Sequence, residues 1–226
     1  MSPPRLLVTG FGPYPKVRVN PTGVLALRLG GSRRLARLGV AVTAQVVETS
    51  YAAAGAAVPP LVARVDPDAC LHLGLAPRER MVRIETRGEN RTRSLSPDVR
   101  GKRPSQRALR PGAPKALKGT PRAAVLLAGL TRAGIRARLS NDAGAYLCNA
   151  MYFWSLDEAR MAGRRRPVVF VHLPWPAAPP GIRPAGRRRG AATPDLGTLV
   201  RALEDIAVQL VLEARAGAAG PGERGA

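Results

Sequence analysis

Histidine and cysteine are scarce in this chain of 226 residues, which holds two of each. Two cysteines, Cys70 and Cys148, cannot build the disulfide framework of a small secreted protein. No run of about 18 or more apolar residues occurs, which argues against a membrane-spanning helix. The N-terminal stretch lacks the long apolar segment of a signal peptide. We therefore expect a cytoplasmic protein with reduced thiols.

Acidic residues are also few, since 15 Asp and Glu oppose 36 Lys and Arg, for a net charge of +21. Such a charge is typical of proteins that bind nucleic acid. Arginine, alanine, glycine and proline are abundant together, however, a pattern that GC-rich coding also produces. The arginine runs Arg164–Arg166 and Arg187–Arg189 contain no aromatic residues on which bases could stack. We expect no nucleic-acid partner, and a basic polyanion-binding protein is kept as the alternative from another class.

Short apolar strands alternate with helical patterns along most of the chain. This order predicts a largely parallel sheet covered by helices on both faces. Pro59-Pro60 predicts a break within one helical pattern, and the alternation in 80–86 predicts an edge or half-buried strand. The predicted strands are 6–8, 40–48, 68–75, 80–86, 135–140 and 167–174, and the predicted helices are 21–30, 51–65, 121–134, 144–161 and 193–216.

Two segments carry few apolar residues. Residues 87–119 are rich in Pro, Gly, Ser and basic residues, and residues 181–192 form a second basic stretch. Both are predicted as loops, and a loop as long as the first is usually functional or mobile. We expect one domain over residues 1–215, ending in a helix capped by Thr193, and a disordered tail over 216–226.

One cysteine stands where a turn becomes a helix, within SNDAGAYLCNAMYFWSL (140–156). Gly144 marks the turn, and apolar residues recur at helical spacing from Tyr146 onward. A helix N-terminus favours the thiolate form of Cys148, and its free N–H groups can face a developing oxyanion. The alternative is plain burial, because free cysteine is among the most buried residue types.

A cysteine nucleophile needs a base, and the chain offers two histidines. His172 ends the apolar run VVFVH just before Pro174, whereas His72 lies inside LHLG. Ligands bind beyond the carboxyl ends of parallel strands, so His172 is the better candidate. It would deprotonate the thiol and protonate the leaving amine. Glu85 could fix its tautomer. By residue type alone, His172 could instead be a structural histidine, and Glu85 a solvated charge at a strand end.

Four stretches together carry a resemblance: LLVTGFGPYPKVRVNPTG (6–23), IETRGEN (84–90), AGAYLCN (143–149) and FVHLP (170–174). They resemble the pyroglutamyl-peptidase I family of cysteine peptidases over roughly residues 5–215. The resemblance implies a three-layer α/β/α sandwich with a mostly parallel, mixed central sheet. It also implies hydrolysis of an N-terminal 5-oxoproline from peptides, without metal or organic cofactor, by a homotetramer or dimer.

The resemblance assigns the roles within the site. Cys148 is implied as the nucleophile, His172 as the general base and acid, and Glu85 as the orienting group. Phe11 and Tyr14 match family positions that hold the lactam ring. The same holds for Tyr146, two residues before the nucleophile. A flat, neutral lactam carries no charge, so stacking area and hydrogen bonds must select it.

The chain also departs from the family pattern. LGLAPRER stands where many bacterial members have a VGQAGGR-like stretch, so that Leu75 replaces a substrate-facing Gln and Pro77 and Arg78 replace glycines. TRSLSPDVRG is a loose counterpart of the family's ARIPDN-like segment, in which Arg93 would match an active-site Arg. Asn20 is expected to brace the first loop. The runner-up interpretation is therefore a relaxed or weakly active hydrolase of the same fold.

Overall fold

The computed structural model describes residues 2–15, 17–92, 97–104, 106–120, 122–163, 165–177 and 193–218. Its centre is a six-stranded sheet with strand order β2-β1-β3-β8-β4-β7. The four strands from β2 to β8 are parallel, whereas β4 runs antiparallel to β8 and parallel to β7. The strands are β1 (Arg5–Phe11), β2 (Ala41–Val47), β3 (Ala69–Leu75), β4 (Val82–Glu85), β7 (Ala137–Ser140) and β8 (Val168–Leu173).

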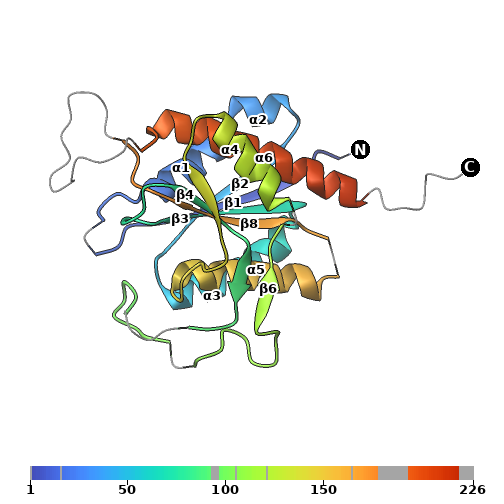
Figure 1. The fold of residues 1–226 in the computed structure, drawn as a ribbon. Coiled ribbons are helices and arrows are strands. Elements are labelled where there is room, and N and C mark those ends of the chain that lie inside the picture. Colours follow the sequence, from blue (N-terminus) through green and yellow to red (C-terminus); the bar gives the residue numbers. More distant parts are fainter. Residues whose placement is uncertain are drawn as a thin grey trace, which may run out of the picture.

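Helices cover both faces of this sheet (Figure 1). On one face lie α3 (Tyr51–Val65) and α5 (Leu147–Met161). The other face carries α1 (Pro21–Gly30), α4 (Ala123–Arg132) and α6 (Leu196–Ala218), with the short α2 (Arg33–Arg37) beside β2 and α6. The predicted three-layer α/β/α sandwich with a mostly parallel, mixed sheet is confirmed.

Alternating side chains of the strands feed two separate apolar cores. In β3, which is buried throughout, Leu71 and Leu73 pack among the side chains of α1, α4 and α6. Cys70 points to the opposite core with the side chains of α3 and α5. Side chains alternate between the two faces along each strand. Near the strand ends, every second side chain therefore points to the α3/α5 face, where the candidate site lies.

The first loop is held by a close approach of helix α1 to strand β1. A Cβ atom added to Gly10 would lie 2.2 Å from the Thr22 carbonyl oxygen, so only glycine fits there. Asn20 caps α1 by accepting from the Thr22 N–H at 3.1 Å, and its amide donates to the Gly12 carbonyl at 3.0 Å. Asn20 therefore braces the loop, as its expected role requires.

The structure corrects two expectations about the strands and helices of the first half. Helix α3 runs unbroken through Pro59 and Pro60, because its buried residues, among them Val58 and Leu61, hold the helix against the sheet despite the two missing N–H donors. Strand β4 is interior rather than at an edge, lying between β8 and β7. Its polar residues are accommodated because Arg83 and Glu85 pair with each other.

The long segment 87–119 is not wholly a loop. It contains a two-stranded antiparallel sheet of β5 (Arg87–Glu89) and β6 (Ala116–Lys118), which packs beside α5. Figure 1 shows this ribbon projecting below the main sheet. The three-residue strands are too short to give a periodic signal in the sequence.

The last helix begins and ends later than expected. Asp195, rather than Thr193, supplies the cap, since its carboxylate accepts from the Thr198 N–H at 2.9 Å and this contact lowers the pKa of Asp195. The helix continues to Ala218, past its predicted end at residue 216 and into the stretch expected as a disordered tail. The predicted loop 181–192 and the residues 219–226 lie outside the described residues. A single domain over 1–215 stays a prediction.

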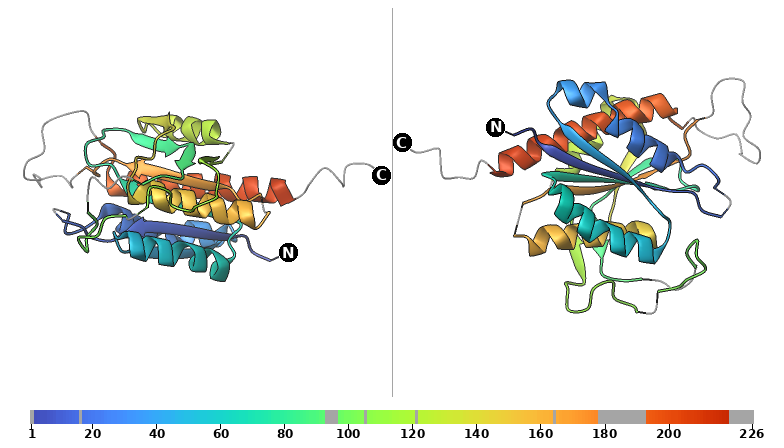
Figure 2. Two further views of the ribbon diagram at one scale, coloured as in Figure 1. Left: turned by 90° about the horizontal axis from the view of Figure 1, so that it is seen from below. Right: turned by 180° about the vertical axis from the view of Figure 1, so that it is seen from behind.

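The two ends of the parallel strands lie on opposite sides of the molecule. Both views in Figure 2 show the start of β1 and the end of α6 on one side. The carboxyl ends of the parallel strands, including Phe11, Leu75 and Leu173, therefore lie at the opposite edge. Helix α5 also begins at this edge. Ligands of parallel α/β sheets bind at the carboxyl ends of the strands, so the candidate site is expected here.

Candidate active site

Cys148 is the second residue of α5. Gly144 occupies the left-handed region with φ at 84°, and α5 begins at Leu147 rather than at the predicted residue 144. The first hydrogen bond of the helix joins the Ala150 N–H to the Tyr146 carbonyl at 3.1 Å. The N–H groups of residues 147–149 precede this bond, and none of them donates to a backbone carbonyl among the described residues. Cys148 thus lies at the positive end of the helix dipole, beside N–H donors that lack an intrahelical acceptor.

His172 and Glu85 come from neighbouring antiparallel strands and meet on the α3/α5 face. The His172 Nδ1 atom lies 2.7 Å from Glu85 Oε1, and the imidazole also interacts electrostatically with the Cys148 side chain. Burial by itself lowers the pKa of His172, but the Cys148 thiolate and the Glu85 carboxylate raise it to about 9. The structure therefore brings together the three residues that the sequence pattern selected, in the order thiol, imidazole, carboxylate.

Neighbouring side chains fix these three groups. The Tyr152 hydroxyl donates to the Glu85 carbonyl at 2.9 Å, which holds the end of β4 against α5. The Phe170 ring lies 4.8 Å from the His172 ring, centroid to centroid. Beneath them, a Cβ atom added to Gly74 would stand 3.0 Å from Cys148 Sγ and closer still to Phe170. Gly74 therefore leaves the space that the thiol and the ring occupy.

His72 has a different environment. It is fully buried in β3, and its Nδ1 atom lies 2.7 Å from the Thr9 hydroxyl. Its Nε2 atom has no hydrogen-bond partner among the described residues, and burial lowers the pKa of His72 to about 3. A ring that stays neutral and sealed in the core cannot exchange protons with a substrate. This placement is that of a structural histidine.

A cavity of about 230 Å³ opens directly onto Cys148. Four of the five predicted substrate-contact residues line it, namely Phe11, Tyr14, Leu75 and Tyr146. The fifth, Arg93, lies outside the described residues. The remaining lining residues are Asn20, Thr49, Pro77 and Leu147. The cavity is thus apolar and aromatic, it carries no charged side chain among these residues, and its size suits one small ring.

The tyrosines of this cavity are neutral and held in place. Burial raises the pKa of Tyr146 to about 12. Burial also raises the pKa of Tyr14, and the nearby Cys148 adds a smaller effect in the same direction. The Tyr146 hydroxyl donates to the Pro97 carbonyl at 3.0 Å. Tyr51, which the sequence did not single out, contacts Tyr146 edge to face with ring centroids 5.5 Å apart. The aromatic wall is therefore preformed.

Asn149 is a further polar residue of the site, and it ends the AGAYLCN stretch. It is fully buried. Its Oδ1 atom accepts from the Glu89 N–H, and its amide donates to the Glu89 carbonyl, both at 2.8 Å, and to the Arg91 carbonyl at 3.1 Å. The residue after the candidate nucleophile thereby ties the start of the long basic segment to α5. An amide directly beside a candidate nucleophile was the available signal.

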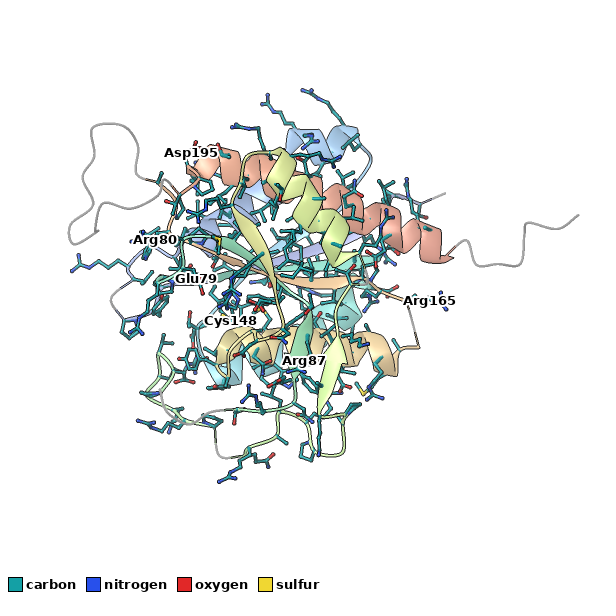
Figure 3. The ribbon with its side chains drawn as sticks, in the orientation of Figure 1. Glu79, Arg80, Arg87, Cys148, Arg165 and Asp195 are labelled. Carbon is teal, nitrogen blue, oxygen red and sulfur yellow. The ribbon has the colours of Figure 1, made fainter. Side chains whose placement is uncertain are left out.

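Part of the positive charge is paired within the molecule. Arg166 is buried and bonds Asp66 at 2.9 Å, and Arg110 bonds Glu158 at 2.6 Å. Figure 3 shows Cys148 and Glu79 on one side of the molecule and Arg165 at the other end of α5. Arg187–Arg189 lies outside the described residues.

Across the described part of the chain, no cluster of three or more metal-ligating His, Cys, Asp or Glu side chains occurs, and no helix is long and apolar enough to cross a membrane.

Comparison with known proteins agrees with this geometry. A sequence model of the pyroglutamyl peptidase family matches residues 4–210. Pyrrolidone-carboxylate peptidase of Pyrococcus furiosus is 32% identical over 172 residues, which cover 76% of this chain and 81% of that protein. The enzyme of the same name from Deinococcus radiodurans is 35% identical over 185 residues, covering 81% and 84%.

Solved structures show the same fold. A crystal structure of a mutant pyrrolidone carboxyl peptidase from P. furiosus has a TM-score of 0.81 at 27% identity, covering 92% of this chain and 98% of that one. Pyroglutamyl peptidase I of Bacillus amyloliquefaciens has a TM-score of 0.81 over 93% of this chain and 98% of its own, at 23% identity, and supports the fold alone. The chain belongs to the pyroglutamyl peptidase family of cysteine peptidases.

Proposed function

We propose that this protein hydrolyses the amide bond after an N-terminal 5-oxoproline in peptides. The observation that carries the proposal is the apolar cavity of about 230 Å³, which opens onto a thiol paired with a buried imidazole and carboxylate. Neither feature alone would define the reaction. Together they join a ring-sized binding site to a nucleophile and a proton carrier.

In the first step, Cys148 Sγ attacks the carbonyl carbon of the 5-oxoprolyl residue as a thiolate. The N–H groups at the start of α5 lie beside the developing oxyanion and stabilise it. His172 holds the proton taken from the thiol and gives it to the leaving amine, which frees the shortened peptide. A thioester between Cys148 and the 5-oxoprolyl group remains.

In the second step, water attacks the thioester while His172 accepts a proton from it. The carbon–sulfur bond then breaks, free 5-oxoproline leaves, and the proton returns to the thiol–imidazole pair. Glu85 accepts from Nδ1 throughout, which keeps Nε2 directed at Cys148 and stabilises the imidazolium. No oxidant, metal or organic cofactor enters this balance.

Recognition of the lactam rests on the cavity walls. Phe11, Tyr14 and Tyr146 supply aromatic surface for a flat ring, and none of the lining residues is charged. A charged N-terminal amine, as in an ordinary peptide, would lose its hydration without gaining a counter-ion there. Leu75 offers no hydrogen bond where many family members have Gln. A relaxed hydrolase with weaker lactam selection is therefore the second candidate.

The test is turnover of a pyroglutamyl-fluorophore amide and the matching prolyl amide by the purified protein. We expect the pyroglutamyl amide to be cleaved far faster, and we expect Cys148→Ala to abolish turnover while melting at the parent temperature. Similar rates for the two amides would favour the relaxed hydrolase. Absence of turnover by the parent would refute the proposal. The expected dimer or tetramer stays a prediction, which light scattering in the same buffer tests.

A further inference from the structure

Arg83 lies two residues before Glu85 on β4, so both side chains point to the same face of the sheet. The strand register sets Arg83 directly opposite His172 on β8, and Glu85 opposite Phe170. Nothing in the sequence singles out Arg83, because a charged residue in a short strand ordinarily faces solvent. Here it faces the two groups that serve Cys148.

The guanidinium of Arg83 contacts three partners. Its Nε atom donates to Glu85 Oε1 at 3.0 Å, and its Nη1 atom donates to Glu79 Oε1 at 3.1 Å. Its Nη2 atom lies 3.1 Å from His172 Nδ1. The Arg83 side chain is only 17% exposed. Since Glu79 anchors one end of the guanidinium, the cation is held in one place beside the imidazole and the carboxylate.

Glu85 needs such a partner. It is fully buried, and its Oε2 atom has no hydrogen-bond partner among the described residues. A buried carboxylate is stable as an anion only when a cation or several donors compensate it. In the proposed reaction, His172 is a cation in some steps and neutral in others, so it cannot compensate Glu85 throughout. Arg83 carries its charge in every step.

We propose that Arg83 is a positioning residue, which keeps Glu85 anionic and correctly aimed and makes His172 a readier proton donor. The inference rests on the proposed function. The first effect follows from the donation to Oε1, which is shared with His172. The second follows from the positive charge beside Nδ1, which opposes retention of a proton by the imidazolium and so favours its transfer to the leaving amine.

The charged groups around His172 give the direction of the pH effect. Cys148 faces it from α5, Glu85 and Arg83 from β4, and Glu79 lies behind Arg83. Removing one cation from this set raises the pKa of every neighbouring group, whether thiol, carboxyl or imidazolium. The pH range in which thiolate and imidazolium coexist must then move upward at both ends.

The experiment compares Arg83→Met, Arg83→Lys and the control Arg138→Met. Arg138 is the register partner of Arg83 on β7 and contacts Glu79 at 3.4 Å, but it makes no hydrogen bond to Glu85 or His172 within the described structure. Its substitution changes the net charge equally. Two readouts are taken across pH: kcat/KM for the pyroglutamyl amide, and the rate at which iodoacetamide alkylates Cys148.

For Arg83→Met we expect both limits of the pH range in which the enzyme is active to rise by about one pH unit. We also expect kcat to fall by a larger factor than KM changes. Arg83→Lys should restore most of the parent profile, and Arg138→Met should match the parent. A lower rate with an unmoved profile in Arg83→Met, or an equal shift in Arg138→Met, would overturn the inference. If the parent does not cleave the amide, the proposed function fails, while the alkylation profiles still decide the role of Arg83.

Discussion

Gly74 is expected to tolerate no side chain, although it is an inconspicuous glycine near the carboxyl end of the buried strand β3. A Cβ atom there would lie 2.6 and 2.7 Å from two carbon atoms of the Phe170 ring and 3.0 Å from Cys148 Sγ. Ordinary carbon contacts are about 3.5–4.0 Å, so the ring would have to retreat by about 1 Å. Phe170 is fully buried against Tyr152, which blocks that retreat.

The magnitude follows from this overpacking. Forcing a methyl group into a well-packed core costs about 1–3 kcal/mol of folding free energy. For a chain of this size, each kcal/mol lowers Tm by about 2–4 °C. Phe170 also contacts the His172 ring, so a displaced ring or thiol misaligns the proposed nucleophile and the proposed base. Misplacement of reacting groups by about 1 Å costs about 100-fold in rate.

The assay measures Tm and kcat/KM of Gly74→Ala for a pyroglutamyl amide. Gly129→Ala is the matched control, because Gly129 lies in helix α4 with nothing within 4 Å of its added Cβ. We expect the control to keep parent activity and to gain up to about 1 kcal/mol in stability. Gly74→Ala with parent Tm and parent kcat/KM would refute the packing of Cys148 over Gly74.

Three further predictions concern the same site. His172→Ala should abolish turnover, whereas His72→Ala should keep it and lose about 1–3 kcal/mol of stability with the Thr9 bond; inactive His72→Ala with normal melting would reassign the base. Leu75→Gln should lower KM for a pyroglutamyl amide by a few-fold with kcat little changed, since a neutral hydrogen bond contributes about 0.5–1.5 kcal/mol; an unchanged KM would remove Leu75 from the lactam site. The pKa of His172, raised to about 9, predicts that kcat/KM falls above about pH 9 as the imidazolium loses its proton. A kcat/KM that still rises at about pH 10 would contradict that assignment.

The sequence predicted the candidate site better than the boundaries of the elements. Cys148 and His172 were selected because both stand at ends of elements that a parallel sheet brings to one edge. The contact between Glu85 and His172 agrees with the role that the family resemblance implied, although short strands alone left it undetermined. Phe11, Tyr14, Leu75 and Tyr146 came from the resemblance, and they share one cavity.

What the sequence could not predict depends on register and on contacts between distant segments. Arg83 stands opposite His172 only because β4 runs antiparallel to β8, and no local pattern reveals the direction of a four-residue strand. Gly74 is special only because Cys148 and Phe170, both distant in sequence, pack over it. Pro59 would break an isolated helix, but tertiary packing of the buried face outweighs the missing donors in α3.

One measurement tests the central claim most directly: hydrolysis of an N-terminally pyroglutamylated peptide during stepwise alkylation with iodoacetamide, with modified cysteines counted by mass spectrometry. Cys70 is fully buried and burial raises its pKa to about 11, so it serves as the internal control. The account predicts that activity falls linearly with modification of Cys148 and reaches zero at one group per chain, with Cys70 unmodified. Activity that persists after complete modification of Cys148 would contradict it.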